Sequence, residues 1–248
     1  LEDDEALINR LGFNNDGMEI VKNRIKLETK KGIVGVNIGP NKNTSDQKDD
    51  FCLGLKNFFD TADYITVNIS SPNTDGLRDF HDKEKLNNLL QTLNKIKKDK
   101  KTGIPLLLKV SPDIKDHYIS EISDVAMKNN ISAIILTNTS DSNRDDLVSP
   151  DKMEVGGLSG EPIQKISTNI IKIFYKKLNG KIPIIGVGGV SSGKSAYEKI
   201  IAGASLLQLY TGFVYKGPSL AKDIKKELIQ ILKDEGIENI KDAIGKGV

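Results

Sequence analysis

The chain has 248 residues, 38% of them hydrophobic and 28% charged, with a formal net charge of +2. This length can bury a sizeable core and suits one α/β barrel or two small domains. The charge is nearly balanced and the lysines are spread along predicted helices, so no nucleic-acid partner is expected. No apolar run approaches the roughly 20 residues of a membrane-spanning helix, and a single cysteine excludes a disulfide within the chain.

Segments with helical spacing alternate with short apolar segments along the chain. Residues 1–17 are predicted to form an acidic helical turn and a polar loop. Helices are then predicted at 18–31, 49–59, 83–98, 116–129, 162–178 and 194–202. Strands are predicted at 33–39, 64–68, 105–110, 133–139, 182–189 and 206–211. Near-continuous apolar strands between helices indicate a parallel sheet that helices cover on both faces.

Polar residues or glycines lie at the carboxyl ends of the predicted strands: Asn37, Asn68, Lys109, Thr137, Gly189 and Tyr210. An open sheet binds ligands at its switch point, whereas a closed barrel gathers side chains from every strand end around one mouth. We therefore predict an α/β fold of the (β/α)8 TIM barrel type, with about six of its eight strand-helix units in this chain. Residues 1–248 are expected to form a single domain. The start at Leu1, without a methionine, suggests that about two N-terminal strands are not in this chain.

Two strand ends carry features that favour chemistry. Lys109 follows three leucines, where an unpaired charge is costly unless an anionic group meets it. The segment 68–78, Asn-Ile-Ser-Ser-Pro-Asn-Thr-Asp-Gly-Leu-Arg, is rich in turn-forming residues and begins where strand 64–68 ends. It is therefore expected to be a polar loop at the mouth of the barrel, where α/β proteins keep catalytic groups.

The glycine-rich segment near residue 190 has two interpretations. Gly188 through Ser195 satisfies the pattern G-x-x-x-x-G-K-[ST], which would make it a nucleoside-triphosphate loop that uses Lys194. The pattern comes late in the chain, however, and no apolar strand ending in Asp follows it to hold magnesium. In the second interpretation, the backbone amides of Gly188 and Gly189 and a helix amino end cradle a phosphate monoester.

Glycines also cluster at 156–160 and next to Tyr210 and Thr211. Together with Gly188 and Gly189, they offer backbone that a ligand can approach closely. The ligand implied is phosphorylated, planar and a cofactor. The two histidines, His81 and His117, lie in polar segments and are expected at the surface, so no metal site is predicted.

Five segments together resemble class 2 dihydroorotate dehydrogenase, the quinone-linked and membrane-associated family. They are Asn-Arg-Leu-Gly-Phe-Asn-Asn from Asn9, Asn-Ile-Gly-x-Asn-Lys from Asn37, the segment 68–78, Gly-Gly-Leu-Ser-Gly from Gly156 and Ile-Gly-Val-Gly-Gly from Ile185. The resemblance covers essentially the whole chain in the family's order. It implies a flavin mononucleotide (FMN) barrel that oxidises dihydroorotate to orotate in pyrimidine biosynthesis.

The same resemblance implies that electrons pass to a membrane quinone through an N-terminal region that this chain lacks. It also implies a peripheral location on the cytoplasmic face of a bacterial inner membrane. Two other interpretations stay open, a nucleoside-triphosphate-binding protein that uses Gly188 through Ser195, and a non-catalytic remnant.

Catalytic roles follow from the resemblance for three residues. Ser71 matches the family's general base, which takes a proton from C5 of dihydroorotate while hydride leaves C6 for the flavin. A serine hydroxyl needs a proton acceptor or relay nearby to act as a base. Thr74 and Phe13 match the positions of that relay and of its shield.

Binding roles follow from the resemblance for two further sets of residues. The residues that match substrate-binding positions are Asn9, Asn68, Asn73, Asn138 and Thr139. Those that match flavin-binding positions are Asn37, Asn68, Lys109, Thr137, Gly160, Gly189, Tyr210 and Thr211. In this assignment Lys109 stabilises negative charge on the reduced flavin ring.

Overall fold

The computed structural model describes residues 1–27, 32–41, 44–71, 73–74, 76–142 and 144–248. Within these ranges a sheet of six parallel strands has the order β2-β3-β4-β5-β7-β8. Its strands are β2 (Gly35–Ile38), β3 (Tyr64–Asn68), β4 (Leu106–Val110), β5 (Ala133–Leu136), β7 (Ile184–Val187) and β8 (Ala204–Gln208). Each of these strands overlaps one of the six predicted strands, so the predicted parallel α/β architecture is confirmed.

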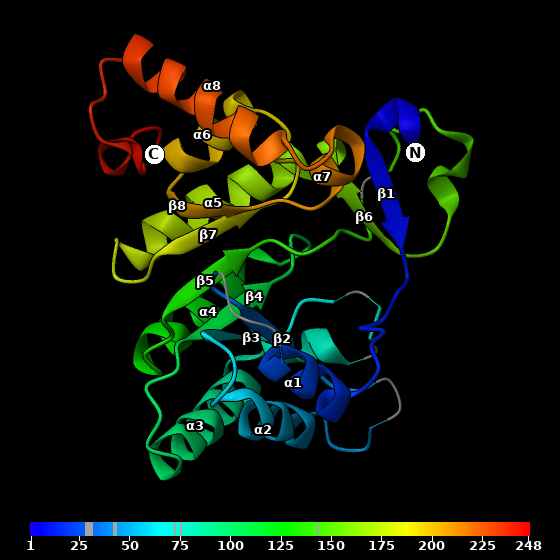
Figure 1. Ribbon diagram of the computed structural model, residues 1–248, viewed down its shortest axis with the longest axis vertical. Helices are drawn as coiled ribbons and strands as arrows, with labels where there is room; N and C mark the ends of the chain where they lie inside the picture. Colours follow the sequence, from blue (N-terminus) through cyan, green and yellow to red (C-terminus); the bar gives the residue numbers. More distant parts are fainter. Residues whose placement is uncertain (28–31, 42–43, 72, 75, 143) are drawn as a thin grey trace.

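Helices lie between and after these strands in the chain (Figure 1). They are α1 (Met18–Leu27), α2 (Gln47–Phe58), α3 (Lys83–Asp99), α4 (Asp116–Lys128), α5 (Gln164–Leu178), α6 (Gly193–Ile201), α7 (Thr211–Lys216) and α8 (Leu220–Asp234). Helices α2, α3, α4 and α5 pack against one another in that order, and α6 packs on α8. The helix predicted at 18–31 begins as expected, while positions 28–31 lie outside the described residues.

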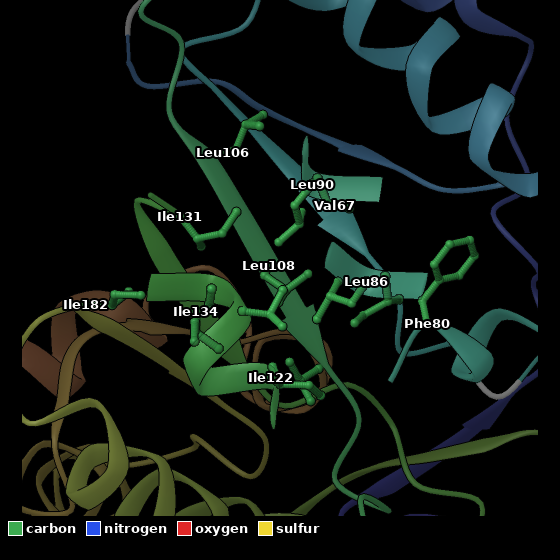
Figure 2. Close-up of a cluster of buried hydrophobic side chains, with 14 of the residues drawn as sticks. Val67, Phe80, Leu86, Leu90, Leu106, Leu108, Ile122, Ile131, Ile134 and Ile182 are labelled. Atoms are coloured by element: carbon green, nitrogen blue, oxygen red, sulfur yellow. The ribbon is translucent and has the colours of Figure 1, made fainter. Parts of the chain in front are cut away.

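The main core lies between the outer face of the sheet and helices α2 to α5, and a second cluster of buried side chains lies between α6 and α8. Side chains alternate between the two faces of a strand, so Leu106 and Leu108 of β4 point outward to meet Leu90 of α3 and Ile122 of α4 (Figure 2). These four side chains are at most 1% exposed. Full burial of each contributes about 2 kcal/mol to folding. The intervening residue, Leu107, lies on the inner face with Ile135 and Ile185.

A second, two-stranded sheet was not expected from the sequence. Strand β1 (Ala6–Asn9) pairs antiparallel with β6 (Gly157–Gly160), so the polar loop predicted within residues 1–17 is wrong at Ala6–Asn9, and no strand was predicted at the glycine cluster 156–160. Each strand has only four residues, and its partner lies about 150 residues away, which local periodicity cannot reveal. Gly160 has φ +106, and a Cβ there would lie 2.3 Å from the Glu5 carbonyl oxygen, so the pairing depends on glycine.

The two edges of the parallel sheet do not meet. Among the described strands, β2 pairs only with β3 and β8 only with β7. The six strand-helix units of a partial barrel are confirmed, and the two further strands stay a prediction. No helix in the described part of the chain is long and apolar enough to cross a membrane.

The two histidines differ in burial. His117 is exposed, as expected. The surface position predicted for His81 is wrong, because the 3-10 helix η2 (Leu77–His81) turns this residue inward beside Phe80 and leaves it 4% exposed. Burial, reinforced by the nearby Arg78 charge, lowers the pKa of His81 to about 4, so the ring is neutral at physiological pH.

Candidate active site

The polar strand ends meet at one edge of the parallel sheet, where two adjoining cavities lie. We call the first the glycine cavity; it has a volume of about 260 Å³, and its lining includes Asn9, Lys109, Thr137, Asn138, Thr139, Gly160, Gly189, Tyr210 and Thr211. We call the second the inner cavity; it has a volume of about 190 Å³, and its lining includes Asn37, Asn68 and Lys109. All eight residues that match flavin positions therefore line one cavity or the other, and Lys109 lines both.

Lys109 is positioned by the register of the sheet. Its Cα pairs with that of Asn68 on β3 and with that of Ile135 on β5, which places its side chain on the inner face. Its ammonium forms no hydrogen bond or ion pair with any residue that the structure describes, and only its backbone is bonded, for example through its carbonyl oxygen to the Ile69 amide at 3.3 Å. Burial lowers the pKa of the Lys109 ammonium. An ammonium in this position is stabilised by an anionic or electron-rich ligand.

One wall of the glycine cavity is bare backbone at Gly188 and Gly189, directly after β7. Their φ angles are +115 and +69, values that favour glycine. A Cβ on Gly189 would lie 2.3 Å from Cβ of Gln164, so no side chain fits between this backbone and α5. A phosphate group can approach such backbone closely.

The amides that a nucleoside-triphosphate loop would need are already engaged. Ser195 Oγ accepts hydrogen bonds from the amides of Ser191 and Ser192, each at 3.0 Å, within a capping box at the start of α6. The Gly193 amide donates to Glu227 Oε2 at 2.5 Å. Lys194 is exposed. This geometry opposes the triphosphate interpretation and leaves Gly188 and Gly189 as the backbone that faces the cavity.

Asn68 and Asn138 meet through a serine that the sequence analysis overlooked. Ser70 Oγ donates to Asn68 Oδ1 at 2.6 Å and accepts from Asn138 Nδ2 at 2.7 Å. Asn138 Oδ1 also accepts from the Thr139 amide at 2.8 Å. Ser70 is fully buried, so this network fixes the orientation of both amides. The signal for Ser70 in the sequence was its position between two predicted site residues, Asn68 and Ser71.

Asn73 approaches the second sheet. Its Nδ2 donates to the carbonyl oxygen of Asn9 at 3.2 Å, and the Asn9 side chain donates to the Gly157 carbonyl at 3.5 Å. The loop after β3 is thereby attached to β1 and β6. Two predicted substrate-binding amides come together at this junction.

The three residues with predicted catalytic roles lie in two different places. Ser71 is 7% exposed, and its Oγ accepts a hydrogen bond from the Asn73 amide at 3.2 Å. Thr74 is 6% exposed. Phe13 lines a different cavity between α1 and β2, against Gly39. Within the described residues no hydrogen bond joins Ser71 to Thr74, and positions 72 and 75 of this loop lie outside them.

The far end of the same loop is fixed by a partly exposed charge network. Arg78 donates to Asp113 at 3.0 Å and to both carboxylate oxygens of Asp141 at 3.0 Å. Asp113 also accepts from Ser140 Oγ at 2.5 Å and Ser142 Oγ at 2.8 Å. Burial disfavours its charged form, but its hydrogen bonds with Asp141, Ser140 and Ser142 outweigh burial and lower the pKa of Asp113. The network ties together the loops that follow β3, β4 and β5.

Residues 1–232 match the family model of dihydroorotate dehydrogenase. The chain belongs to the dihydroorotate dehydrogenase family. Over 246 residues it is 46% identical to dihydroorotate dehydrogenase (quinone) of Bartonella tribocorum, with 98% of this chain and 68% of that protein covered. It is 41% identical over 246 residues to dihydroorotate dehydrogenase (quinone) of Agrobacterium fabrum, with 98% of this chain and 68% of that protein covered.

Solved structures agree with these relatives. Ligand-free DHODH from Eimeria tenella superposes with a TM-score of 0.92 at 36% identity and covers 99% of this chain, which spans 75% of that structure. The complex of the Eimeria tenella DHODH with ferulenol gives a TM-score of 0.90 at 35% identity, with 98% of this chain and 72% of that chain covered. The resemblance to the quinone-dependent dihydroorotate dehydrogenases is confirmed. These comparisons give no support to a nucleoside-triphosphate-binding protein.

Proposed function

We propose that this protein oxidises dihydroorotate to orotate in pyrimidine biosynthesis, with FMN as cofactor. The observation that carries the proposal is Lys109, a half-buried lysine at the junction of two cavities, whose ammonium has no protein partner among the described residues. Every residue that matches a flavin position in this dehydrogenase family lines one of these cavities. We take residues 1–248 as one FMN-binding unit.

The lining residues fit a phosphorylated flavin. Gly160, Gly189, Tyr210 and Thr211 line the glycine cavity, where bare backbone can receive a phosphate, and we assign them to the phosphate end. Asn37, Asn68, Lys109 and Thr137 are assigned to the flavin ring. Bound FMN supplies the hydride acceptor. Lys109 supplies a fixed positive charge that stabilises negative charge on the reduced ring.

Five amides and hydroxyls are assigned to the substrate: Asn9, Asn68, Asn73, Asn138 and Thr139. The ring of dihydroorotate carries donors and acceptors on its edges, and its carboxylate accepts hydrogen bonds, so such side chains suit it. The amide oxygen of Asn68 is already engaged by Ser70, which leaves the Asn68 amide nitrogen as the group that donates. Ser70 thus supports the substrate site without contacting the substrate.

Ser71 is assigned the role of general base at C5 of dihydroorotate. Its hydroxyl is buried and therefore shielded from bulk water. Thr74, which is buried in the same loop, is assigned to the proton relay, and Phe13 to shielding this end of the loop. The loop is anchored at both ends, by Ser70 at the sheet and by Arg78 at Asp113.

We further propose that the electrons pass to a membrane quinone. The names of the relatives, dihydroorotate dehydrogenase (quinone), support this acceptor. A peripheral position on the cytoplasmic face of a bacterial membrane would bring the protein to its acceptor. Reduction of a short-chain ubiquinone analogue that depends on dihydroorotate tests this part, and an enzyme that reduces only oxygen or a nicotinamide cofactor would contradict it.

A visible spectrum and one variant test the proposed activity. The purified protein should take up FMN, turn yellow and lose the colour when dihydroorotate is added without oxygen. A Ser71→Ala variant should bind FMN as the wild type does and be reduced about 10²–10⁴-fold more slowly. Ser45→Ala, at an exposed serine outside both cavities, serves as the matched control. A protein that takes up no flavin contradicts the function, and unchanged reduction in Ser71→Ala removes Ser71 from its role.

A further inference from the structure

Lys199 in α6 is a buried lysine that the proposed reaction does not use. Its side chain is 0% exposed. Its ammonium donates to the Gln164 carbonyl at 3.4 Å, to Ser167 Oγ at 3.0 Å and to Thr168 Oγ1 at 3.1 Å. All three acceptors are uncharged and belong to the first turns of α5. Burying an ammonium without a carboxylate partner costs folding free energy, because the charge loses its hydration. An apolar side chain that filled the same space would avoid this cost.

The residues that hold Lys199 also contact the glycine loop, which we define as residues 187–189. Ser167 Oγ donates to the Val187 carbonyl at 2.5 Å. A Cβ on Gly188 would lie 3.0 Å from Cβ of Ser167, and a Cβ on Gly189 would lie 2.3 Å from Cβ of Gln164. One layer of α5 therefore separates the Lys199 ammonium from backbone that lines the glycine cavity.

The charges around Lys199 leave its ammonium without an ion pair among the described residues. Glu198 on the same helix accepts from the Gln164 side chain, and Glu161 accepts from Ser191 Oγ at 3.4 Å. On the α8 side, Glu227 accepts from the Gly193 amide. Burial lowers the pKa of Lys199 to about 7, against the opposing effect of Glu198 and Glu161. A negative ligand at the glycine loop would favour the protonated form.

We propose that Lys199 is a positioning residue for the phosphate of the flavin cofactor. It holds the first turns of α5 against the glycine loop, and its positive charge favours an anion on the far side of that loop. The role rests on the proposed function, because it presumes that FMN binds there. It predicts that Lys199 discriminates FMN from riboflavin, which has the same ring and no phosphate.

Affinities for FMN and riboflavin, measured by fluorescence quenching, test this role in the wild type and in three variants. Lys199→Met and Lys199→Gln remove the buried charge, and Lys199→Gln keeps hydrogen-bond donors. Lys194→Gln removes an exposed charge from the same helix and is the control. In both Lys199 variants the FMN affinity should fall about tenfold, which is about 1.4 kcal/mol, while the riboflavin affinity and the Lys194→Gln protein stay unchanged.

Each other outcome decides the matter. Equal losses for FMN and riboflavin would overturn the role, because they would show a structural effect alone. If neither Lys199 variant folds, calorimetry on the wild type at pH 8 in two buffers decides. Uptake of a proton with FMN and not with riboflavin supports the role, and equal uptake overturns it. A wild-type protein that binds neither flavin overturns the proposed function itself.

Discussion

Lys109 at the end of β4 is half-buried and Lys199 in α6 is fully buried, and burial lowers the pKa of each, yet their surroundings differ. Lys199 directs its ammonium to three protein oxygens. Lys109 lies between two cavities, and its ammonium has no partner among the described residues. Burial alone therefore does not identify a ligand-binding lysine. The hydrogen bonds of the ammonium distinguish the two roles. Lys199 bonds to protein oxygens and so stabilises the fold, whereas the Lys109 ammonium has no protein partner among the described residues and can interact with a ligand.

The largest expected difference between the two lysines is in folding stability without ligand. Lys199→Ala should lower the free energy of unfolding by about 4 kcal/mol, because it leaves a cavity and removes the hydrogen bonds of the ammonium to Gln164, Ser167 and Thr168. Lys109→Met should leave the stability unchanged or raise it, because it removes an unpartnered charge. Urea unfolding of both variants measures this difference. Similar losses in the two proteins would show that Lys109 also holds the scaffold.

A smaller effect is the pH dependence that Lys199 gives to the folding stability. Its folded pKa of about 7 lies below the ordinary value of 10.5, so the unfolded chain binds more protons between these pH values. Stability should therefore rise with pH across this window, and this contribution is lost as pH falls towards 7. Relative to Lys199→Met, the wild type should gain about 2 kcal/mol between pH 7 and pH 9. A constant difference between the two proteins would mean that Lys199 keeps its ordinary pKa.

The smallest effect concerns the start of the helix that carries Lys199. Ser192 caps α6 by accepting from the Ser195 amide at 3.2 Å, so Ser192→Ala should cost about 1 kcal/mol of stability. FMN affinity should change little, because the cap lies outside the contacts between Lys199 and the glycine loop. Denaturant unfolding and FMN titration of the same sample measure both quantities. A loss of FMN affinity as large as that in Lys199→Met would show that the placement of α6, and not the charge, governs binding.

Much of the parallel sheet could be predicted because each strand carries its own apolar signal. Strand β3 has the bounds predicted at 64–68, and β4 begins one residue later than expected. Strand β8 was predicted at 206–211 but spans Ala204–Gln208, because the polar end that follows it belongs to the start of α7. Strands β1 and β6 could not be found, since only their mutual pairing makes them strands.

The residues of the site also divide into those that could be predicted from the sequence and those that could not. Lys109 stood out in the sequence because a charge follows three leucines, and the structure places it on the inner face of the sheet. Ser70 and Lys199 did not stand out, because their roles depend on contacts between segments far apart in the chain. The assignment of Phe13 depends on the family resemblance, and its contacts lie at Gly39. The residue type at a strand end predicted residues of the site, whereas hydrogen-bond networks between distant elements could not be predicted from the sequence.

The midpoint potential of bound flavin in the Lys109→Met protein tests most directly whether Lys109 serves the cofactor. Loss of the positive charge should destabilise the reduced flavin and make the potential more negative by about 30–60 mV, where 30 mV for two electrons is about 1.4 kcal/mol. Lys194→Gln, which removes an exposed charge, should keep the wild-type potential. An unchanged potential in Lys109→Met would contradict the assignment of Lys109 to the flavin.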